Sequence, residues 1–519
     1  MLYFSCEMAN AINIPKTHLI MGLSLPLAVL LGYFVAEPME LGSMAIVVFV
    51  LVVLSLPLLL KWYYPILVMT WNAAIFPVFF PGRAGLWAMM AFVGLVFAVL
   101  TRAVSANSRF VIEPSITKAL AVLTGVVVVT GLATGGFGVQ SLGSGRYGGK
   151  NYFYFLAAVA GYFVFTSRRI PRQRAGLYVG LFFLSGLTYG LVELAGRAGP
   201  RFAPLLLFLT PGGVSPEGTF DASQRFFPSM VRLEGLSLFG AAIYAYVLAR
   251  FGLGGLLDLK RPWRLLALVL AVVAGMLSGF RTFMVLAGLT FAVMFYLEGL
   301  HRTRYVPALL GVALLGGALV LPQADKLPLV VQRSISFLPG KFNWVARESA
   351  STTVEWRVGM WRDVLPEVPK CLFRGKGWGI DAGEFHATQV MTGAASAADP
   401  LAGTILAGDF HNGPLSVLIP FGLYGTLAFV WFLVAGLRVL HRNWKFGDPA
   451  LRNVNTLLLA AFAAHVVLFV CVFGALQVDM AIFAGLLGLS VALNGAEPEP
   501  APAEQPAAGV EYNTEYIKA

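Results

Sequence analysis

The amino-acid sequence predicts an all-α polytopic membrane protein that crosses the bilayer many times and carries one large helical loop outside it. Two observations indicate this fold class. Of 519 residues, 58% are hydrophobic and 12% are charged, and the mean hydropathy is +0.76, which lies outside the range of soluble domains. The apolar residues also fall into runs of about 20, the helix length that a hydrocarbon core of roughly 30 Å requires.

About 14 such runs are predicted to be transmembrane helices. They cover residues 17–36, 41–60, 64–80, 85–103, 117–135, 151–167, 175–195, 233–250, 264–280, 283–300, 305–322, 414–440, 454–473 and 478–495. Pro77 and Pro81 interrupt the third run, because proline cannot continue a helix. The predicted organisation is transmembrane helices in 1–322, a periplasmic loop domain in 323–412, further transmembrane helices in 413–495, and a disordered Pro-, Ala- and Glu-rich tail in 496–519.

The net charge of +11, from 37 lysines and arginines against 26 acidic residues, does not indicate nucleic-acid binding. The basic residues are scattered through short loops, and the short loops richest in them fall on one side of the predicted membrane. By the positive-inside rule this side is cytoplasmic, so we expect both termini to be cytoplasmic and the 323–412 segment to face outward. The three cysteines form no disulfide or metal-binding pattern.

A polar turn directly precedes the apolar run 414–440. It reads Asp409-Phe410-His411-Asn412-Gly413-Pro414-Leu415-Ser416, and its Asn, Gly and Pro residues favour a turn. His411 is therefore expected at the outer boundary between water and bilayer, where a neutral imidazole can accept a proton. The alternative interpretation is a loop histidine without a function. His386, near Asp381 and Glu384, is a second candidate base.

Two arginines stand at the outer ends of predicted helices. Arg232 lies where the loop 196–232 becomes a helix, and Arg281 follows Ser278-Gly279-Phe280 in a loop too short for ordinary loop functions. Each arginine alone is consistent with an interfacial anchor whose charged end reaches water.

The histidines of the chain have no metal-ligand spacing with one another, so no metal site is predicted.

The outer segment 323–412 has a predicted order of its own. Residues 329–337 are expected to form a short apolar helix on the membrane surface. The capping-box pattern Thr352-x-x-Glu355 predicts a helix start, and Pro366 ends the run that follows. Val354, Trp361 and Leu365 share the apolar face of this helix. The glycine-rich stretch 374–379 then predicts a turn that leads back toward His411.

These motifs together resemble the O-antigen ligase and polymerase superfamily, whose members transfer glycans from a lipid pyrophosphate carrier at the outer side of the bacterial inner membrane. The shared features are His-Asn-Gly-Pro-Leu-Ser followed by Phe-Gly-Leu-Tyr-Gly, the two helix-end arginines, and Glu-Trp-Arg-x-x-x-Trp at 355–361. The resemblance covers residues 225–440. Phe280 stands where the family more often has serine, which alters the turn and leaves the guanidinium of Arg281 unchanged.

The resemblance implies a glycosyltransferase that is metal-independent, cofactor-free and inverting. Its donor is a glycan on polyprenyl (undecaprenyl) pyrophosphate, its acceptor is a glycan or glycolipid, and its active site faces the periplasm. His411 is then the catalytic base, and Arg232 and Arg281 bind the pyrophosphate. The supporting residues are Asn412, Arg225 and Arg357.

An O-antigen ligase is the preferred interpretation, and a polysaccharide polymerase of the same superfamily is the alternative, because the two differ in acceptor. A lipid-linked oligosaccharide flippase is an alternative from another class. It would be expected to carry charged residues within spans, little ordered mass outside and two related halves. Here the predicted spans are nearly free of charge, no internal repeat is visible, and the long outer segment carries turn and cap signals. A purely structural membrane protein is the remaining alternative.

The predicted topology can be tested by cysteine labelling in intact cells. A cysteine at Ser396 should react with a membrane-impermeant thiol reagent, whereas a cysteine at Gln173 should not, because the positive-inside rule places the two loops on opposite sides. The reverse labelling would invert the orientation.

Overall fold

The computed structural model describes most of the chain beyond residue 58. The described residues are 59–77, 84–104, 110–137, 146–199, 232–258, 260–381 and 408–495, with Pro26, Val29, Gly32, Arg201 and Leu209. The described residues from Tyr64 onward belong to one compact unit. Several predictions concern residues outside this described set. They are most of the predicted spans 17–36 and 41–60, the predicted tail 496–519, and the candidate site residues Arg225 and His386.

The regular secondary structure of the described chain is helical apart from one short antiparallel strand pair, β1 (Arg146–Tyr147) and β2 (Ile380–Asp381). Within the described residues, eight helical segments are long and apolar enough to cross a membrane: Leu86–Ala103, Pro114–Thr134, Arg172–Arg197, Glu234–Leu256, Tyr305–Lys326, Gly413–Phe446, Pro449–Cys471 and Leu476–Asn494. Shorter apolar helices are Trp263–Leu277 and Arg281–Leu297. The prediction of a helical protein with several helices long and apolar enough to span a membrane is confirmed.

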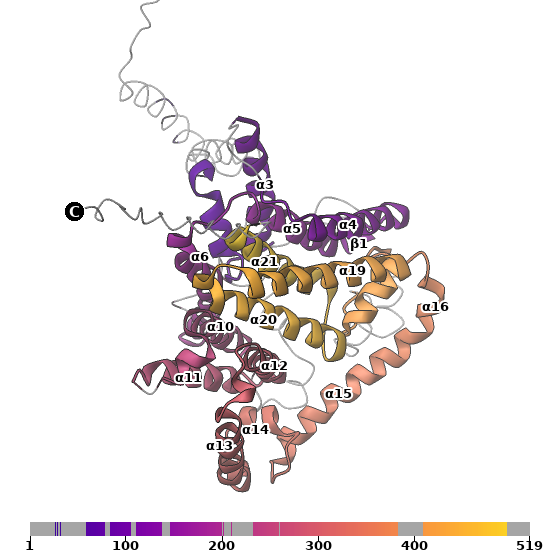
Figure 1. Cartoon of the computed structure of the whole chain (residues 1–519). Coiled ribbons are helices and arrows are strands. Elements are labelled where there is room, and N and C mark those ends of the chain that lie inside the picture. The colour runs from indigo at the N-terminus through magenta and orange to yellow at the C-terminus, as the bar shows by residue number, and fades with distance from the viewer. Residues whose placement is uncertain are drawn as a thin grey trace, which may run out of the picture. The chain divides into compact units, whose positions relative to one another are not determined.

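Figure 1 shows the arrangement of the helices. In chain order they are α3 (Leu86–Val104), α4 (Pro114–Thr134), α5 (Gly149–Phe165), α6 (Arg172–Leu184), α7 (Leu187–Arg197), α10 (Glu234–Leu256), α11 (Trp263–Leu277), α12 (Arg281–Leu297), α13 (Tyr305–Val320), α14 (Leu329–Ile335), α15 (Trp344–Val364), α16 (Val368–Cys371), α19 (Gly413–Phe446), α20 (Arg452–Cys471) and α21 (Leu476–Asn494).

The span predicted at 64–80 stops being helical after Thr70, and residues 71–77 continue as non-helical chain. This stretch is nevertheless largely buried, and its polar groups form hydrogen bonds. Trp71 donates from Nε1 to the carbonyl oxygen of Ala481 (3.2 Å), so that its side chain is fixed against α21. Pro77 prevents a return to helix in this stretch, and buried polar contacts replace the helical hydrogen bonds it lacks.

The span predicted at 175–195 is divided into α6 and α7 at Ser185 and Gly186. A Cβ atom on Gly186 would lie 3.0 Å from the Cβ atom of Ala242 on α10. The break therefore stands where two helix backbones approach closely, which only a residue without a side chain allows.

The loops that carry many of the basic residues meet at one end of the helix bundle. The N–H of Ile170, in the arginine-rich loop after α5, donates to the carbonyl oxygen of Ala492 near the end of α21 (2.7 Å). The N–H of Leu253 near the end of α10 donates to Oε1 of Glu298 at the end of α12 (2.8 Å). These basic loops thus share one end, as the topology prediction requires of them.

The loops that carry the candidate site residues meet at the other end of the same helices. The N–H of Leu233, just before α10, donates to the carbonyl oxygen of Ser278 just before α12 (3.0 Å). The N–H of Trp378 donates to the hydroxyl of Tyr152 in the first turn of α5 (2.9 Å). Because α5 and α10 run from this end to the basic end, the site loops and the basic loops lie at opposite ends of the bundle.

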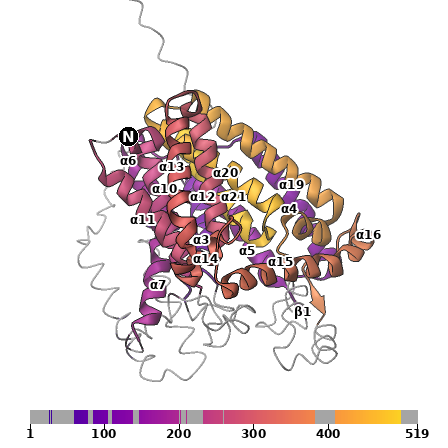
Figure 2. The same ribbon diagram turned by 90° about the horizontal axis from the view of Figure 1, so that it is seen from below.

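Helix α15 begins earlier than predicted. Asn343 caps it, and the Asn343 side chain accepts a hydrogen bond from the N–H of Val345 (2.9 Å). The capping-box prediction is wrong, because Thr352 lies inside the helix and its hydroxyl donates to the carbonyl oxygen of Glu348 (2.9 Å). The helix does end before Pro366. In Figure 2, α15 runs from α14 to α16 across the ends of the bundle helices.

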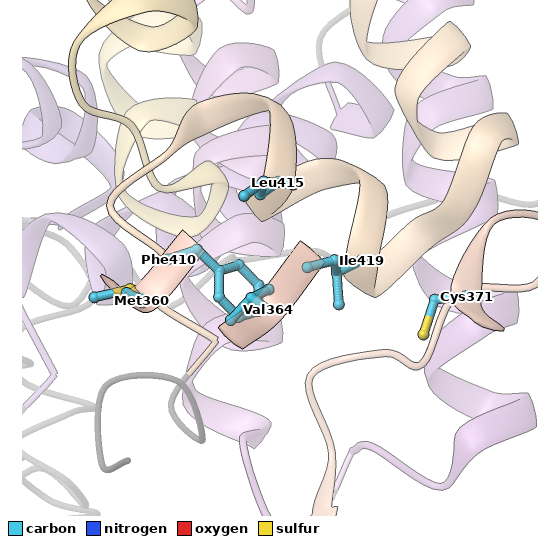
Figure 3. Packing of buried hydrophobic residues seen from close by; sticks show 6 residues of the cluster. All are labelled: Met360, Val364, Cys371, Phe410, Leu415 and Ile419. Atoms are coloured by element: carbon cyan, nitrogen blue, oxygen red, sulfur yellow. The ribbon is translucent and has the colours of Figure 1, made fainter. Parts of the chain in front are cut away.

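The buried face of α15 also differs from the predicted one. Val354 and Leu365 are 50% and 54% exposed, whereas Met360 and Val364 are buried. Trp361 is partly buried, and its Nε1 donates to the carbonyl oxygen of Phe410 in the polar turn (3.0 Å). Figure 3 shows the resulting cluster of Met360, Val364, Cys371, Phe410, Leu415 and Ile419. This cluster fastens the residue before His411 to α15.

Helix α19 is broken within its first three turns. Pro420 has no N–H group to donate, and Gly422 has a φ of 62°, which favours glycine. The N–H of Leu423, which the break releases, donates instead to the carbonyl oxygen of Leu372 (2.6 Å).

The glycine-rich stretch after α16 pairs the remaining polar groups of this break. The carbonyl oxygens of Ile419 and Pro420 accept hydrogen bonds from the N–H groups of Lys376 (3.1 Å) and Gly377 (2.8 Å). Non-helical backbone is tolerated at membrane depth only where protein satisfies it. The predicted turn therefore has a defined place, in the gap that Pro420 and Gly422 open in α19.

Replacing Gly375 tests this docking. Gly375 has a φ of 68°, and an added Cβ would lie 2.3 Å from the carbonyl oxygen of Pro420. We expect Gly375→Ala to destabilise the fold by about 1–3 kcal/mol and to lower the thermal midpoint of the purified protein in detergent. The control is Gly359→Ala in α15, where an added Cβ meets nothing within 4 Å. It should be neutral or slightly stabilising, and equal effects of the two variants would contradict the docking.

Candidate active site

The polar turn before α19 holds His411 in an unusual backbone conformation. Its φ is 49°, and it is the one residue other than glycine with positive φ in the described parts of the chain. The backbone N–H of His411 donates to Oδ1 of Asp409 (3.3 Å), and the next residue, Asn412, caps α19 by accepting the N–H of Leu415 (3.1 Å). The turn thus directs the imidazole by local hydrogen bonds, and Asn412 serves as a helix cap.

The imidazole of His411 is oriented by a carboxylate and two aromatic rings. Its Nδ1 lies 3.1 Å from Oδ1 of Asp409. The ring meets Trp356 edge to face with centroids 5.1 Å apart, and Phe473 likewise at 5.0 Å. The side chain is 23% exposed. When Nδ1–H donates to Asp409, Nε2 carries the free lone pair of the neutral ring and is the atom that accepts a proton.

Arg357 of α15 lies beside the same aromatic ring. Its guanidinium carbon is 5.5 Å from the centroid of Phe473, and one Nη donates a long hydrogen bond to the carbonyl oxygen of Val472 (3.5 Å). Burial lowers the pKa of Arg357 from its ordinary value and the cation of Arg281 lowers it further, while the carboxylate of Asp409 opposes both. Arginine stays protonated nevertheless, so the site holds a poorly hydrated cation.

The Nε atom of Arg357 is buried without a hydrogen-bond partner among the described residues. A buried donor of this kind costs free energy unless something accepts from it. Together with its lowered pKa, this makes the guanidinium of Arg357 a position where a bound anion would lower the free energy of the protein.

Arg281 opens α12 and reaches α15. Its Nη2 donates to the carbonyl oxygen of Ala350 (2.7 Å), two helical turns before Arg357 on the same helix. Arg281 contributes to the lowered pKa of Arg357, after the larger effect of burial. The structure therefore brings both Arg281 and Asp409 of the histidine turn close enough to Arg357 to affect its pKa.

Arg232 lies on the other side of the turn that leads into α12. Its guanidinium carbon is 5.8 Å from the ring centroid of Phe280, and its Cγ would be 3.7 Å from a Cβ atom added to Gly279. The turn 278–281 thus contacts Arg232 and supplies Arg281, so both predicted arginines belong to one corner of the fold. Phe280 is the aromatic ring beside which the guanidinium of Arg232 lies.

Two residues of this site carry roles that the sequence analysis did not assign. Arg333 of α14 is 3% exposed and donates from three nitrogens, to Oγ of Ser349 (3.1 Å), the carbonyl oxygen of Gly279 (2.7 Å) and Oγ1 of Thr353 (3.0 Å). It joins α14 and α15 to the turn before Arg281. No signal in the sequence distinguishes Arg333 from a surface arginine on a short helix.

Asp409 is the second residue, and a signal for it was present. It stands two residues before His411 in the polar turn, a spacing that allows a side chain to bond the backbone two residues on.

Among the described residues, no group of three His, Cys, Asp or Glu side chains is arranged to hold a metal ion. The site as described offers one imidazole, one carboxylate and at least two cations.

No protein-family model matches the chain, and no curated protein matches it in sequence.

Proposed function

We propose that this protein transfers a glycan from a polyprenyl pyrophosphate carrier to an acceptor sugar, in the manner of the O-antigen ligases. The observation that supports this most is the arrangement of His411, Asp409, Arg357 and Arg281 at one end of an apolar helix bundle. A carboxylate-oriented imidazole beside poorly hydrated guanidinium groups suits a reaction in which a proton is removed and a phosphate leaves.

The arginines supply the electrostatic part of the reaction. When the bond between the anomeric carbon and the carrier oxygen breaks, its electron pair remains on the pyrophosphate, whose negative charge grows. Guanidinium groups bind phosphate oxygens through two parallel N–H donors and keep their charge. Stabilising charge that develops in the transition state is usually the largest catalytic contribution. A pyrophosphate among Arg232, Arg281 and Arg357 would also relieve the repulsion between neighbouring cations.

His411 supplies the base. The acceptor hydroxyl attacks the anomeric carbon, its oxygen forms the new glycosidic bond, and its proton passes to Nε2 of His411. Asp409, bonded to Nδ1, then stabilises the imidazolium that forms. Direct attack opposite the leaving pyrophosphate inverts the anomeric configuration. In this scheme the arginines stabilise the leaving group, so the reaction is metal-independent and requires no cofactor.

The same proposal places the protein in the bacterial inner membrane with about 14 transmembrane helices and both termini in the cytoplasm. The 323–412 segment and the site then face the periplasm. The separation of the basic loops from His411 along the bundle supports this orientation, because positively charged short loops favour the cytoplasmic side. Use of a carrier-linked chain as acceptor would make the protein a polymerase, with the same site and chemistry.

The phosphate-binding role of the arginines is tested by lysine substitution. Arg281→Lys and Arg357→Lys should each lower glycan transfer by roughly tenfold to a hundredfold, because lysine keeps the charge and loses the two-donor geometry. Arg232→Lys should behave alike. A double variant should be little worse than the weaker single variant, since the residues act on one leaving group.

Transfer is measured with purified protein in liposomes that contain the lipid-linked donor and an acceptor. Arg347→Lys is the matched control, because Arg347 is an exposed residue of α15 whose one Nη donates to the carbonyl oxygen of Gly340 (3.1 Å). It should retain transfer. Full activity in the three site variants would refute phosphate binding, and donor movement without product would indicate a flippase.

The base is tested separately. His411→Ala should lower transfer by roughly a hundredfold to ten-thousandfold while the variant inserts normally and still binds inorganic pyrophosphate. His441→Ala is the control, since His441 is an exposed histidine on the same helix at the basic end. Near-normal transfer by His411→Ala would show that His411 is structural and direct attention to His386.

A further inference from the structure

A buried ionisable pair joins α20 and α21 within the apolar bundle. Nε2 of His465 lies 2.7 Å from Oδ1 of Asp479, and each residue is 5% exposed. Ionisable groups inside membrane-spanning segments are costly and are kept where they hold a defined structure or function. None of the roles assigned above uses this pair.

The second carboxylate oxygen of Asp479 holds the turn between the two helices. The N–H of Ala475, the residue that caps α21, donates to Oδ2 of Asp479 (2.7 Å). Asp479 thus reaches back to the start of its own helix, as the acidic residue of a capping box does. One carboxylate therefore ties His465 of α20 to the backbone at residue 475.

The same turn is pressed against the start of α19. The N–H of Leu476 donates to Oγ of Ser416 (3.1 Å), and a Cβ atom added to Gly474 would lie 2.9 Å from the Cα of Gly413. Backbone at this distance leaves no room for the turn 472–475 to shift without moving the first turn of α19, which follows His411 directly.

Two residues of this turn support the candidate active site. The carbonyl oxygen of Val472 accepts from Arg357, and the ring of Phe473 lies between His411 and Arg357, with separations of 5.0 Å and 5.5 Å. A displacement of the turn by a fraction of an ångström would therefore misplace the base and a phosphate ligand together.

We propose that Asp479, held by His465, is a positioning residue for His411 and Arg357, acting through the turn 472–475. The proposal rests on the proposed glycan transfer for its catalytic consequence, but not for its structural one. Asp479 and His465 touch no substrate. They fix the backbone on which Phe473 and the carbonyl of Val472 are presented to the site.

The test compares Asp479→Ala, Asp479→Asn and Ser490→Ala in the full-length protein. Asparagine can accept from the N–H of Ala475 and donate to Nε2 of the other tautomer of His465, so it should preserve the turn. Ser490→Ala is the control, because it removes a buried hydrogen bond from Asn443 (3.1 Å) at the other end of α21. Amide hydrogen exchange, transfer kinetics and the thermal midpoint are measured for each variant.

Asp479→Ala should raise amide exchange in peptides that cover 472–476 and 408–413 by about tenfold or more, and should lower kcat by roughly tenfold to a hundredfold. Asp479→Asn should restore both quantities to within about threefold of the unmodified protein. Ser490→Ala should lower the thermal midpoint alone. If Asp479→Ala fails to insert, His465→Leu is measured in its place, with the same expectations.

Unchanged exchange at 472–476 in Asp479→Ala, or an equal loss of kcat in Ser490→Ala, would overturn the positioning role. Raised exchange with unchanged kcat would overturn it as well. If the unmodified protein transfers no glycan, the proposed function fails while the exchange measurement still decides whether the pair fixes the turn. The two proposals can thus fail independently.

Discussion

The site depends on how the chain satisfies the backbone of the broken helix α19. Pro420 and Gly422 release two carbonyl groups and one N–H group inside an apolar bundle, where an unpaired peptide group costs several kcal/mol. The stretch 372–377 pairs all three. Because this stretch directly follows α16, the pairing holds that part of the outer segment against α19, the helix that begins just after His411. Without the break, nothing in the described chain would tie α16 to α19 in this way.

A second constraint is electrostatic. Arg281 lies close enough to Arg357 to contribute to the lowered pKa of Arg357, whose main cause is burial. A partly buried cation costs free energy unless an acceptor or a bound anion compensates for the hydration it has lost. Arg333 shows the alternative, because each of its three guanidinium nitrogens donates to an acceptor of the protein, which indicates a structural role. Arg357 has a buried Nε without an acceptor among the described residues. This contrast between Arg333 and Arg357 is the physical reason to regard the first as a structural support and the second as a ligand for an anion.

Some of this could be predicted because the signals are local. Membrane-spanning helices follow from runs of apolar residues, and the helices beginning at Glu234, Arg281 and Gly413 start where expected within a few residues. The polar turn around His411 was likewise visible in its Asn, Gly and Pro residues. The capping-box interpretation of Thr352 failed because the same two residues are equally compatible with the middle of a helix, where a threonine hydroxyl bonds the preceding turn. The true cap of α15 is Asn343. It was missed because the capping-box pattern at Thr352 and Glu355 is the more conspicuous signal in the sequence.

The sequence by itself determined a helical membrane protein, the candidate residues His411, Arg232 and Arg281, and the separation of basic loops from the polar turn. These properties follow from composition and from spacing along one chain. The tertiary structure decided which residues act together. Asp409 lies against the imidazole of His411, and α15 carries Arg357 within electrostatic reach of both Asp409 and Arg281. Arg333 and Asp479 form hydrogen bonds to the turns that lead into the site. The contacts of Arg281, Arg333 and Arg357 join positions 16 to 115 residues apart. No local pattern encodes such contacts, because they arise only when packed helices leave polar groups that must find partners.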